Sequence, residues 1–207
     1  MPREGDHKGL LVDFGGVLTT NVFDSFRDFC VAEGLEPDAF VRLMTEDPEA
    51  RAQLRRVETG AIAEGEFAGV LAERLGVAER KGLVDRLFAG MRPDHAMLAA
   101  VRAAKAAGVR TGLVSNSIGE GRYDRSTFPE LFHAVVISAE EGLHKPEPEI
   151  FLLGAQRAGV DPAECVFVDD LRENCRGAEA VGMTAVLHRG AEGTLPALEE
   201  LLGVPLG

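Results

Sequence analysis

The chain has 207 residues, of which 45% are hydrophobic and 27% are charged, and these are the proportions of a folded globular protein. Its formal net charge of −12 at pH 7 would repel a nucleic acid, and no compact basic patch offsets that charge. No apolar stretch approaches the length needed to cross a bilayer, so we expect a cytoplasmic protein with neither a nucleic-acid nor a membrane partner. The sequence leaves the oligomeric state open.

Five short apolar runs predict buried β-strands. The first, Leu10 to Val12, is followed directly by Asp13 and then by a turn that contains Gly15 and Gly16. The runs are too short and too apolar to be helices on the protein surface. The other four predicted strands are residues 109–114, 134–137, 166–168 and 184–187.

Helical patterns separate most of these strands, at residues 94–107, 149–158 and 174–181. Strands that alternate with helices predict an α/β fold with a parallel sheet covered on both faces. Residues 22–90 break the alternation because they contain only helix-like patterns, among them 65–75 and 77–88. We therefore predict a core formed by residues 1–19 and 91–207, with a helical domain inserted at residues 20–90.

Polar residues gather at one edge of the predicted sheet. Ligands of open parallel sheets bind beyond the carboxyl ends of the strands, because loops and helix N-termini converge there. The residues that fall at this edge are Asp13, Ser115 with Asn116 and Ser117, Lys145, and Asp169 with Asp170. Neighbouring carboxylates would repel one another unless a cation lay between them, and a set of oxygen ligands favours Mg²⁺. The sequence therefore predicts a magnesium site.

Four motifs carry a resemblance to a known family. Residues 11–18 (LVDFGGVL) and 113–117 (LVSNS), the pair Lys145-Pro146 and the run 168–170 (VDD) resemble the motifs of the haloacid dehalogenase-like superfamily, in the correct order. Residues 166–186 are similar to the branch that contains sugar-phosphate phosphatases and the N-terminal phosphatase domain of epoxide hydrolases. The resemblance covers nearly the whole chain. It implies a Rossmann-like core with a small helical cap, on which residues near Phe23, Phe26 and Phe67 are candidates for substrate selection.

The resemblance also implies a function. It suggests a magnesium-dependent phosphohydrolase that cleaves a small phosphorylated metabolite, for example a sugar phosphate, through an aspartyl-phosphate formed on Asp13. Asp13, the carbonyl oxygen of Gly15 and Asp170 would hold the Mg²⁺ ion. Asp169 would contact the metal through water or orient one of its ligands, and Asn174 would support this arrangement through a hydrogen bond.

The phosphoryl group would be held by a second set of residues. Lys145 would supply a fixed positive charge to the phosphoryl oxygens and to Asp13, and Ser115 would donate its hydroxyl. The backbone N–H groups of Phe14 and Asn116 would complete the cradle.

One position departs from the usual pattern of these phosphatases. The residue two positions after the nucleophile is commonly an aspartate that acts as general acid and base, and here it is Gly15. A slow enzyme, a good leaving group or another proton donor would each be compatible with this change, and His144 is one candidate donor. Two other functions stay open: a 2-haloacid dehalogenase that works without metal, and a non-catalytic protein that binds phosphorylated ligands.

Overall fold

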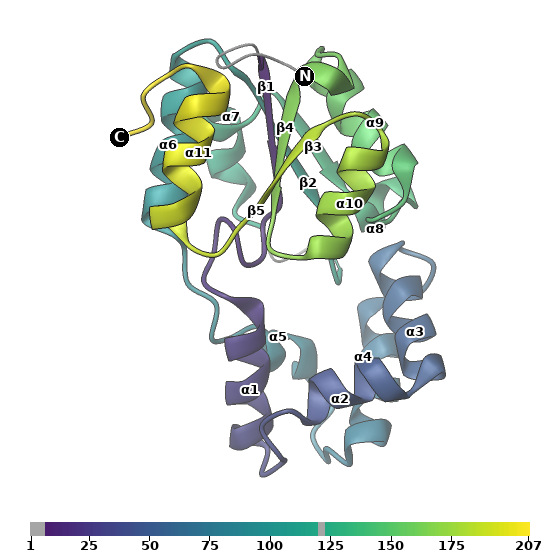
Figure 1. Ribbon diagram of the computed structural model, residues 1–207. Coiled ribbons are helices and arrows are strands. Elements are labelled where there is room, and N and C mark those ends of the chain that lie inside the picture. The colour runs from purple at the N-terminus through teal and green to yellow at the C-terminus, as the bar shows by residue number, and fades with distance from the viewer. Residues whose placement is uncertain (1–6, 120–122) are drawn as a thin grey trace.

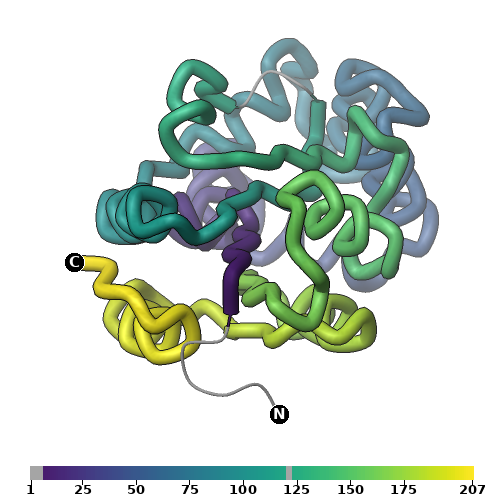
Figure 2. Tube along the Cα trace, turned by 90° about the horizontal axis from the view of Figure 1, so that it is seen from above, coloured from purple at the N-terminus to yellow at the C-terminus, as the bar shows by residue number. Residues whose placement is uncertain are grey.

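The computed structural model describes residues 7–119 and 123–207, and in it five strands form one parallel sheet in the order β3-β2-β1-β4-β5. All five predicted strands are confirmed, with ends that shift by at most one residue, but residues 184–187 are half-buried where a buried strand was predicted. Their bounds are β1 Gly9–Val12, β2 Arg110–Ser115, β3 Ala134–Ile137, β4 Cys165–Asp169 and β5 Thr184–Leu187. β1 lies in the middle of the sheet, paired with β2 and β4 (Figure 2).

Helices cover both faces of the sheet, as the alternation of elements predicts (Figure 1). One face packs against α6 (His95–Ala106), α7 (Phe128–Leu131) and α11 (Ala191–Leu202). The other packs against α9 (Pro148–Ala158) and α10 (Arg172–Ala180). Short helices η1 (Arg125–Thr127), α8 (Ser138–Glu141) and η2 (Pro162–Glu164) complete this part of the chain. The fold is therefore α/β and Rossmann-like.

Two apolar cores lie on the two faces of the sheet because successive strand side chains point in opposite directions. In β1, Leu10 and Val12 belong to the core that contains Met97, and Leu11 belongs to the core that contains Phe151. All three β1 side chains are fully buried, which explains why the strand reads as a continuous apolar run.

A helical segment lies beyond the carboxyl ends of the strands (Figure 1). It contains α1 (Val22–Ala32), α2 (Ala39–Glu46), α3 (Pro48–Glu58), α4 (Glu64–Leu75) and α5 (Leu83–Leu87). These helices share an apolar core of their own, in which Phe29, Phe67 and Leu87 are buried. We call residues 20–90 the helical insertion. The chain enters the insertion after β1 and leaves it before β2. These two connecting segments lie side by side and form an antiparallel bridge between Thr19 and Pro93.

The predicted helix at residues 77–88 is wrong over its first half. Only Leu83–Leu87 is helical, because Gly82 has a left-handed backbone with φ of 62° immediately before the helix begins. The predicted core ranges also include residues 1–6 and 120–122, which lie outside the described residues. Among the helices of the described chain, none has the length and apolar character required to span a membrane.

Candidate active site

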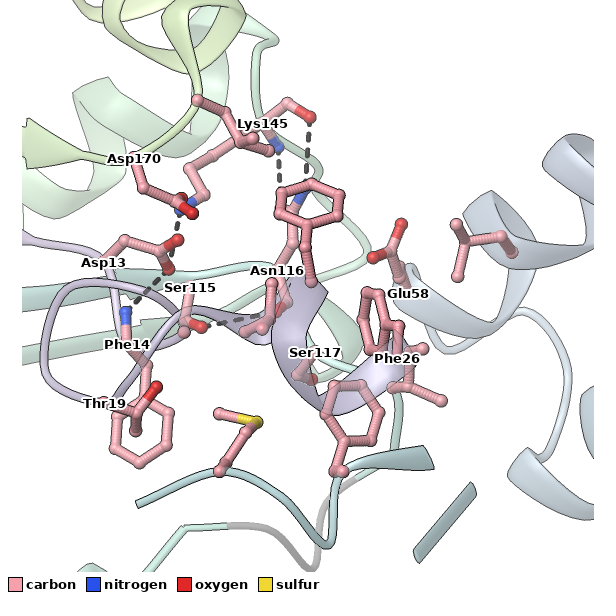
Figure 3. Close-up of a pocket in the computed structure, with 18 of the residues that line it drawn as sticks. Asp13, Phe14, Thr19, Phe26, Glu58, Ser115, Asn116, Ser117, Lys145 and Asp170 are labelled. Carbon is pink, nitrogen blue, oxygen red and sulfur yellow. Dashed lines mark hydrogen bonds and ion pairs between the residues drawn. The ribbon is translucent and has the colours of Figure 1, made fainter. Parts of the chain in front are cut away.

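The site lies at the carboxyl end of β1, where the sheet brings together the predicted polar residues (Figure 3). Asp13 follows the last residue of β1, and its backbone N–H donates to the carbonyl oxygen of Val168 at 2.9 Å. This bond prolongs the pairing of β1 with β4, so the position of Asp13 is fixed by the sheet itself. Its side chain is only 12% exposed.

Lys145 bridges two carboxylates. Its Nζ lies 2.8 Å from Asp13 Oδ1 and 2.8 Å from Asp169 Oδ2, and its side chain has no exposed surface. Burial by itself would lower the pKa of Lys145, but the charges of Asp13 and Asp169 outweigh burial and raise that pKa above its ordinary value. The ammonium group therefore stays protonated, and a buried charge is acceptable here because it is paired.

Asp169 is held by several donors in addition to Lys145. Its Oδ1 accepts the backbone N–H of Leu171 at 2.8 Å, and Asn174 Nδ2 lies 3.0 Å from each of its carboxylate oxygens. Asp169 is fully buried and Asn174 is 5% exposed. Both oxygens of Asp169 are thus engaged by protein groups, and this carboxylate fixes the position of the Lys145 ammonium.

Asp13, Asp169 and Asp170 form an acidic cluster, in which one oxygen from each lies within 4.8 Å of the others. Burial, followed by the charge of Asp169, raises the pKa of Asp170 to about 6. Burial also raises the pKa of Asp13 to about 7, although Lys145 opposes this shift. A hard divalent cation would relieve the repulsion, and the all-oxygen donors of Asp13 and Asp170 fit Mg²⁺.

The turn after β1 allows Asp170 to approach closely. Gly16 has φ of 74°, and a Cβ atom built on it would lie 2.4 Å from Asp170 Oδ2. The N–H of Gly16 donates to Thr19 Oγ1 at 3.1 Å, and the N–H of Phe14 donates to Asp13 Oδ1 at 2.7 Å. Glycine is therefore required at position 16 both for the backbone conformation and for space. The Phe14 N–H, which the sequence assigns to the phosphoryl cradle, is occupied by Asp13 here.

Ser115 ends β2 beside Asp13 and is 2% exposed. Its Oγ accepts a hydrogen bond of 3.0 Å from Tyr123 Oη, and burial raises the pKa of Tyr123 to about 12. The Tyr123 ring packs edge-on against Phe14, with ring centroids 4.8 Å apart. Sequence reasoning missed Tyr123, because a lone tyrosine in a loop after β2 carries no motif. That it is the only tyrosine in the chain was the one signal available.

Asn116 ties two loops together through its side chain. Its Oδ1 accepts the N–H of Lys145 at 2.9 Å, and its Nδ2 donates to the Lys145 carbonyl at 3.2 Å. Asn116 Nδ2 also lies 3.1 Å from His144 Nε2, which in turn lies 2.8 Å from Glu58 Oε2 in the helical insertion. Glu58 is a second residue that sequence reasoning missed.

A cavity of about 700 Å³ opens between the sheet edge and the helical insertion. Asp13, Gly15, Ser115, Lys145 and Asp170 line one end, so most of the predicted site residues reach one space (Figure 3). Phe14, Asn116 and Asn174 line it as well. Asp169 does not line it but contacts Lys145, which does.

Two of the three phenylalanines predicted to select substrate also face this cavity. Phe23 and Phe26 line it. Phe67 itself does not reach the cavity, because it is 1% exposed and lies within the apolar core of the insertion. His144 does not appear in the lining either, so the structure gives no support to it as a proton donor to substrate.

The fold and the site together define a Rossmann-like α/β protein with an aspartate at the end of its central strand and a buried lysine beside it. Residues 7–182 match the family model of haloacid dehalogenase-like hydrolases, and the chain belongs to that family.

Curated relatives cover parts of the chain. A glyceraldehyde 3-phosphate phosphatase of Methanopyrus kandleri is 35% identical over 111 residues, which are 51% of this chain and 48% of that protein. A sesquiterpene phosphatase of Aspergillus oryzae is 31% identical over 55% of this chain and 59% of its own. The matched region thus spans only about half the length of these relatives.

Solved structures share the fold over nearly the whole chain. An enzyme of the same family from Bacteroides thetaiotaomicron superimposes with a TM-score of 0.71 at 23% identity, over 93% of this chain and 98% of that one. The same enzyme has been solved in complex with magnesium and inorganic phosphate, and that structure has a TM-score of 0.64 over 87% of this chain and 93% of that one.

Proposed function

We propose that the protein is a magnesium-dependent phosphohydrolase that cleaves a small phosphorylated metabolite, with a sugar phosphate as one possibility, through an aspartyl-phosphate on Asp13. The observation that carries this proposal is a group of three residues. Asp13, which follows the central strand β1, lies 2.8 Å from Lys145 Nζ and beside the carboxylate of Asp170. A nucleophilic carboxylate, a fixed cation and a carboxylate suited to a metal are the groups that phosphoryl transfer requires.

In the proposed reaction, a carboxylate oxygen of Asp13 forms a bond to phosphorus while the bond from phosphorus to the substrate oxygen breaks. The leaving oxygen takes up a proton from solvent. Water then attacks phosphorus and loses a proton to solvent, while the bond between phosphorus and the Asp13 oxygen breaks, which releases inorganic phosphate and regenerates Asp13. Lys145 holds a positive charge beside Asp13 throughout, and the Ser115 hydroxyl is within the same cavity to donate to a phosphoryl oxygen.

Asp13, Asp170 and the Gly15 carbonyl would hold Mg²⁺ in this scheme, since these residues line the cavity and offer oxygen ligands. Bound Mg²⁺ would neutralise the phosphate and reduce its repulsion from Asp13. Asp169 would act through Lys145, because its two oxygens are taken by Lys145, Leu171 and Asn174. The relatives named as phosphatases, and the structural neighbour solved with magnesium and phosphate, support the same assignment.

Phosphate release tests the proposal. Wild-type protein and Asp13→Asn are compared on sugar phosphates, nucleotides and p-nitrophenyl phosphate, with magnesium and with EDTA. We expect magnesium-dependent release that Asp13→Asn lowers by at least about 10³-fold. Asp28→Asn is the matched control, because Asp28 is an exposed aspartate of α1 and does not line the cavity.

Other results would favour the alternatives. Halide release from a 2-haloacid without metal would identify a dehalogenase. Binding of phosphorylated compounds with no turnover on any of them would indicate a non-catalytic protein, and would make Gly15 the decisive difference from active phosphatases.

A further inference from the structure

The cavity has two chemically different ends. The end at the sheet edge carries Asp13, Ser115, Lys145 and Asp170. Much of the rest of the lining is apolar, and most of these apolar side chains come from the helical insertion: Val22, Phe23, Phe26, Phe40, Val41, Met44, Leu54, Phe88, Met91 and Ile118. A phosphate bound at the polar end would therefore project its organic group toward hydrocarbon and aromatic surface.

Aromatic rings organise the apolar end. Phe26 lies at the centre of this group, with its ring centroid 4.6 Å from Phe40, 5.5 Å from Phe88 and 5.9 Å from Phe23. Figure 3 shows Phe26 across the cavity from Asp13. These rings fix the shape of the wall by their mutual packing, so the apolar surface is a built feature of the cavity.

The same cavity holds apolar side chains that water can reach. Phe23, Val41 and Leu171 line it and remain 40%, 37% and 41% exposed. The other large hydrophobic residues with comparable exposure in the described chain are Val31 and Leu152, and neither lines the cavity. Exposed apolar surface is thus concentrated at the cavity, which is typical of a site that binds an apolar ligand.

Polar side chains at the insertion end are already engaged with protein groups. Arg92 Nη1 donates to the carbonyl oxygens of Ala89 and Met91 at 2.7 and 2.8 Å. Thr45 Oγ1 donates to the Val41 carbonyl at 2.8 Å, and Glu58 contacts His144. A sugar would bring several hydroxyl groups to a wall whose polar side chains are largely engaged, although the buried Ser117 Oγ in the lining has no hydrogen-bond partner among the described residues, and unpaired hydroxyls weaken binding strongly.

We infer that the substrate is a phosphomonoester of an apolar alcohol, with a hydrocarbon or aromatic group that fills the insertion end of the cavity. The inference rests on the proposed function and narrows its substrate class away from sugar phosphates. A volume of about 700 Å³ exceeds the needs of a phosphate alone and suits an organic group of considerable size.

Chain length gives the inference a quantitative signature. Each methylene group transferred from water to an apolar surface improves binding by about three- to fourfold. Butyl, hexyl and octyl phosphate should therefore bind with affinities that rise by about tenfold at each step of two carbons. A site selective for sugars would bind glucose 6-phosphate more tightly than any of these and would not discriminate along the series.

The test measures binding of these four compounds to Asp13→Asn protein with Mg²⁺ by calorimetry, because this variant should hold substrates without turnover. Phe23→Ser and Val41→Thr are each added to it. We expect each to lower the affinity for octyl phosphate by at least about threefold, with a smaller loss for butyl phosphate. The matched controls, Leu152→Ser and Val31→Thr, change exposed apolar residues outside the cavity and should leave the series unchanged.

The binding series separates this inference from the proposed function. A flat series, or tighter binding of glucose 6-phosphate, would overturn the inference even if wild-type protein released phosphate from every compound. Affinity that rises with chain length would support it even if wild-type protein released none, in which case the proposed function would fail alone. Val41→Thr preserves side-chain shape, so its result stands if Phe23→Ser does not fold.

Discussion

Asp13 is an acid whose charge the folded protein disfavours when no metal is bound. Burial raises its pKa from 3.8 to about 7, so between these values the folded state binds more protons than the unfolded state. The unfolding free energy of metal-free protein should therefore fall as pH rises from about 4 to 7, by up to about 1.4 kcal/mol per pH unit from Asp13. Urea denaturation in EDTA at several pH values measures this dependence.

The difference between variants isolates the Asp13 contribution from that of other carboxylates. Asp13→Asn should be more stable than wild type near pH 7.5 and should lose this advantage toward pH 4, while Asp28→Asn should follow wild type. An advantage that grew as pH fell would contradict the assigned pKa shift.

Lys145 stabilises the fold as well as the proposed reaction, because it lies between two buried carboxylates at 2.8 Å from each. Lys145→Met should lower the unfolding free energy by about 3–5 kcal/mol in chemical denaturation, since it leaves those charges unpaired. Adding Asp169→Asn should recover part of the loss. Lys8→Met removes an exposed ion pair with Glu164 and should cost less than about 1 kcal/mol. Equal losses of unfolding free energy in Lys145→Met and Lys8→Met would show that the buried ion pairs stabilise the fold no more than the exposed one.

The residues of the site differ in how far sequence could find them. Asp13 and Asp170 directly follow apolar strands and Ser115 ends one, so the rule that parallel strands end at one edge is enough to bring them together. Tyr123 and Glu58 reach the same cavity from a loop and from α3. Their positions depend on how the helical insertion and the loops pack in three dimensions, which strand periodicity does not encode.

At the scale of the element, the turn after β1 sets the distance between Asp13 and Asp170. Gly16→Ala should strain a backbone with φ of 74° and push a methyl group into Asp170. Gly34→Ala has the same backbone strain, with φ of 75°, but open space around it. Both variants should lose about 1–2 kcal/mol of unfolding free energy, and only Gly16→Ala should weaken magnesium-dependent phosphate release, by about tenfold or more.

This pair of glycines separates backbone strain from the site. Loss of activity in both variants would mean that strain alone impairs the protein, whereas full activity in Gly16→Ala would show that the Asp170 carboxylate is free to move aside without consequence.

Elements with strong periodic patterns were predictable, and elements governed by single residues were not. The strands at residues 134–137 and 184–187 have the predicted bounds because each is a short apolar run, although the first is largely buried and the second is only half-buried. The predicted helix at 77–88 overlooked Gly82, whose left-handed conformation delays the helix to Leu83. Helix α11 was not predicted, and it contains Pro196 in its interior, where proline normally argues against a helix.

At the scale of the whole molecule, the cavity depends on contacts that join the helical insertion to the sheet edge. Ser138 Oγ donates to the Glu58 carbonyl, and Ser117 N–H donates to Ser138 Oγ at 2.9 Å. Arg55 forms an ion pair with Glu147 close to the same junction. These contacts involve α3, the loop after β2, the first residue of α8 and the residue before α9, so segments far apart in sequence hold the insertion against the sheet edge.

Binding of Mg²⁺ with inorganic phosphate should stabilise the whole chain, because ligands that bind only the folded state shift the unfolding equilibrium. At about 100 times the dissociation constant the gain is about 2.7 kcal/mol, which corresponds to a rise in melting temperature of about 5–11 °C for a protein of this size. Asp170→Asn should abolish most of that rise, since it removes one of two carboxylates proposed to hold the ion. Asp28→Asn should retain the full rise, and differential scanning calorimetry measures wild type, Asp170→Asn, Asp28→Asn and Asp13→Asn. If Asp170→Asn kept the full rise while Asp13→Asn lost it, the ion would be held by Asp13 without Asp170, and the raised pKa of Asp170 would reflect only burial beside Asp169.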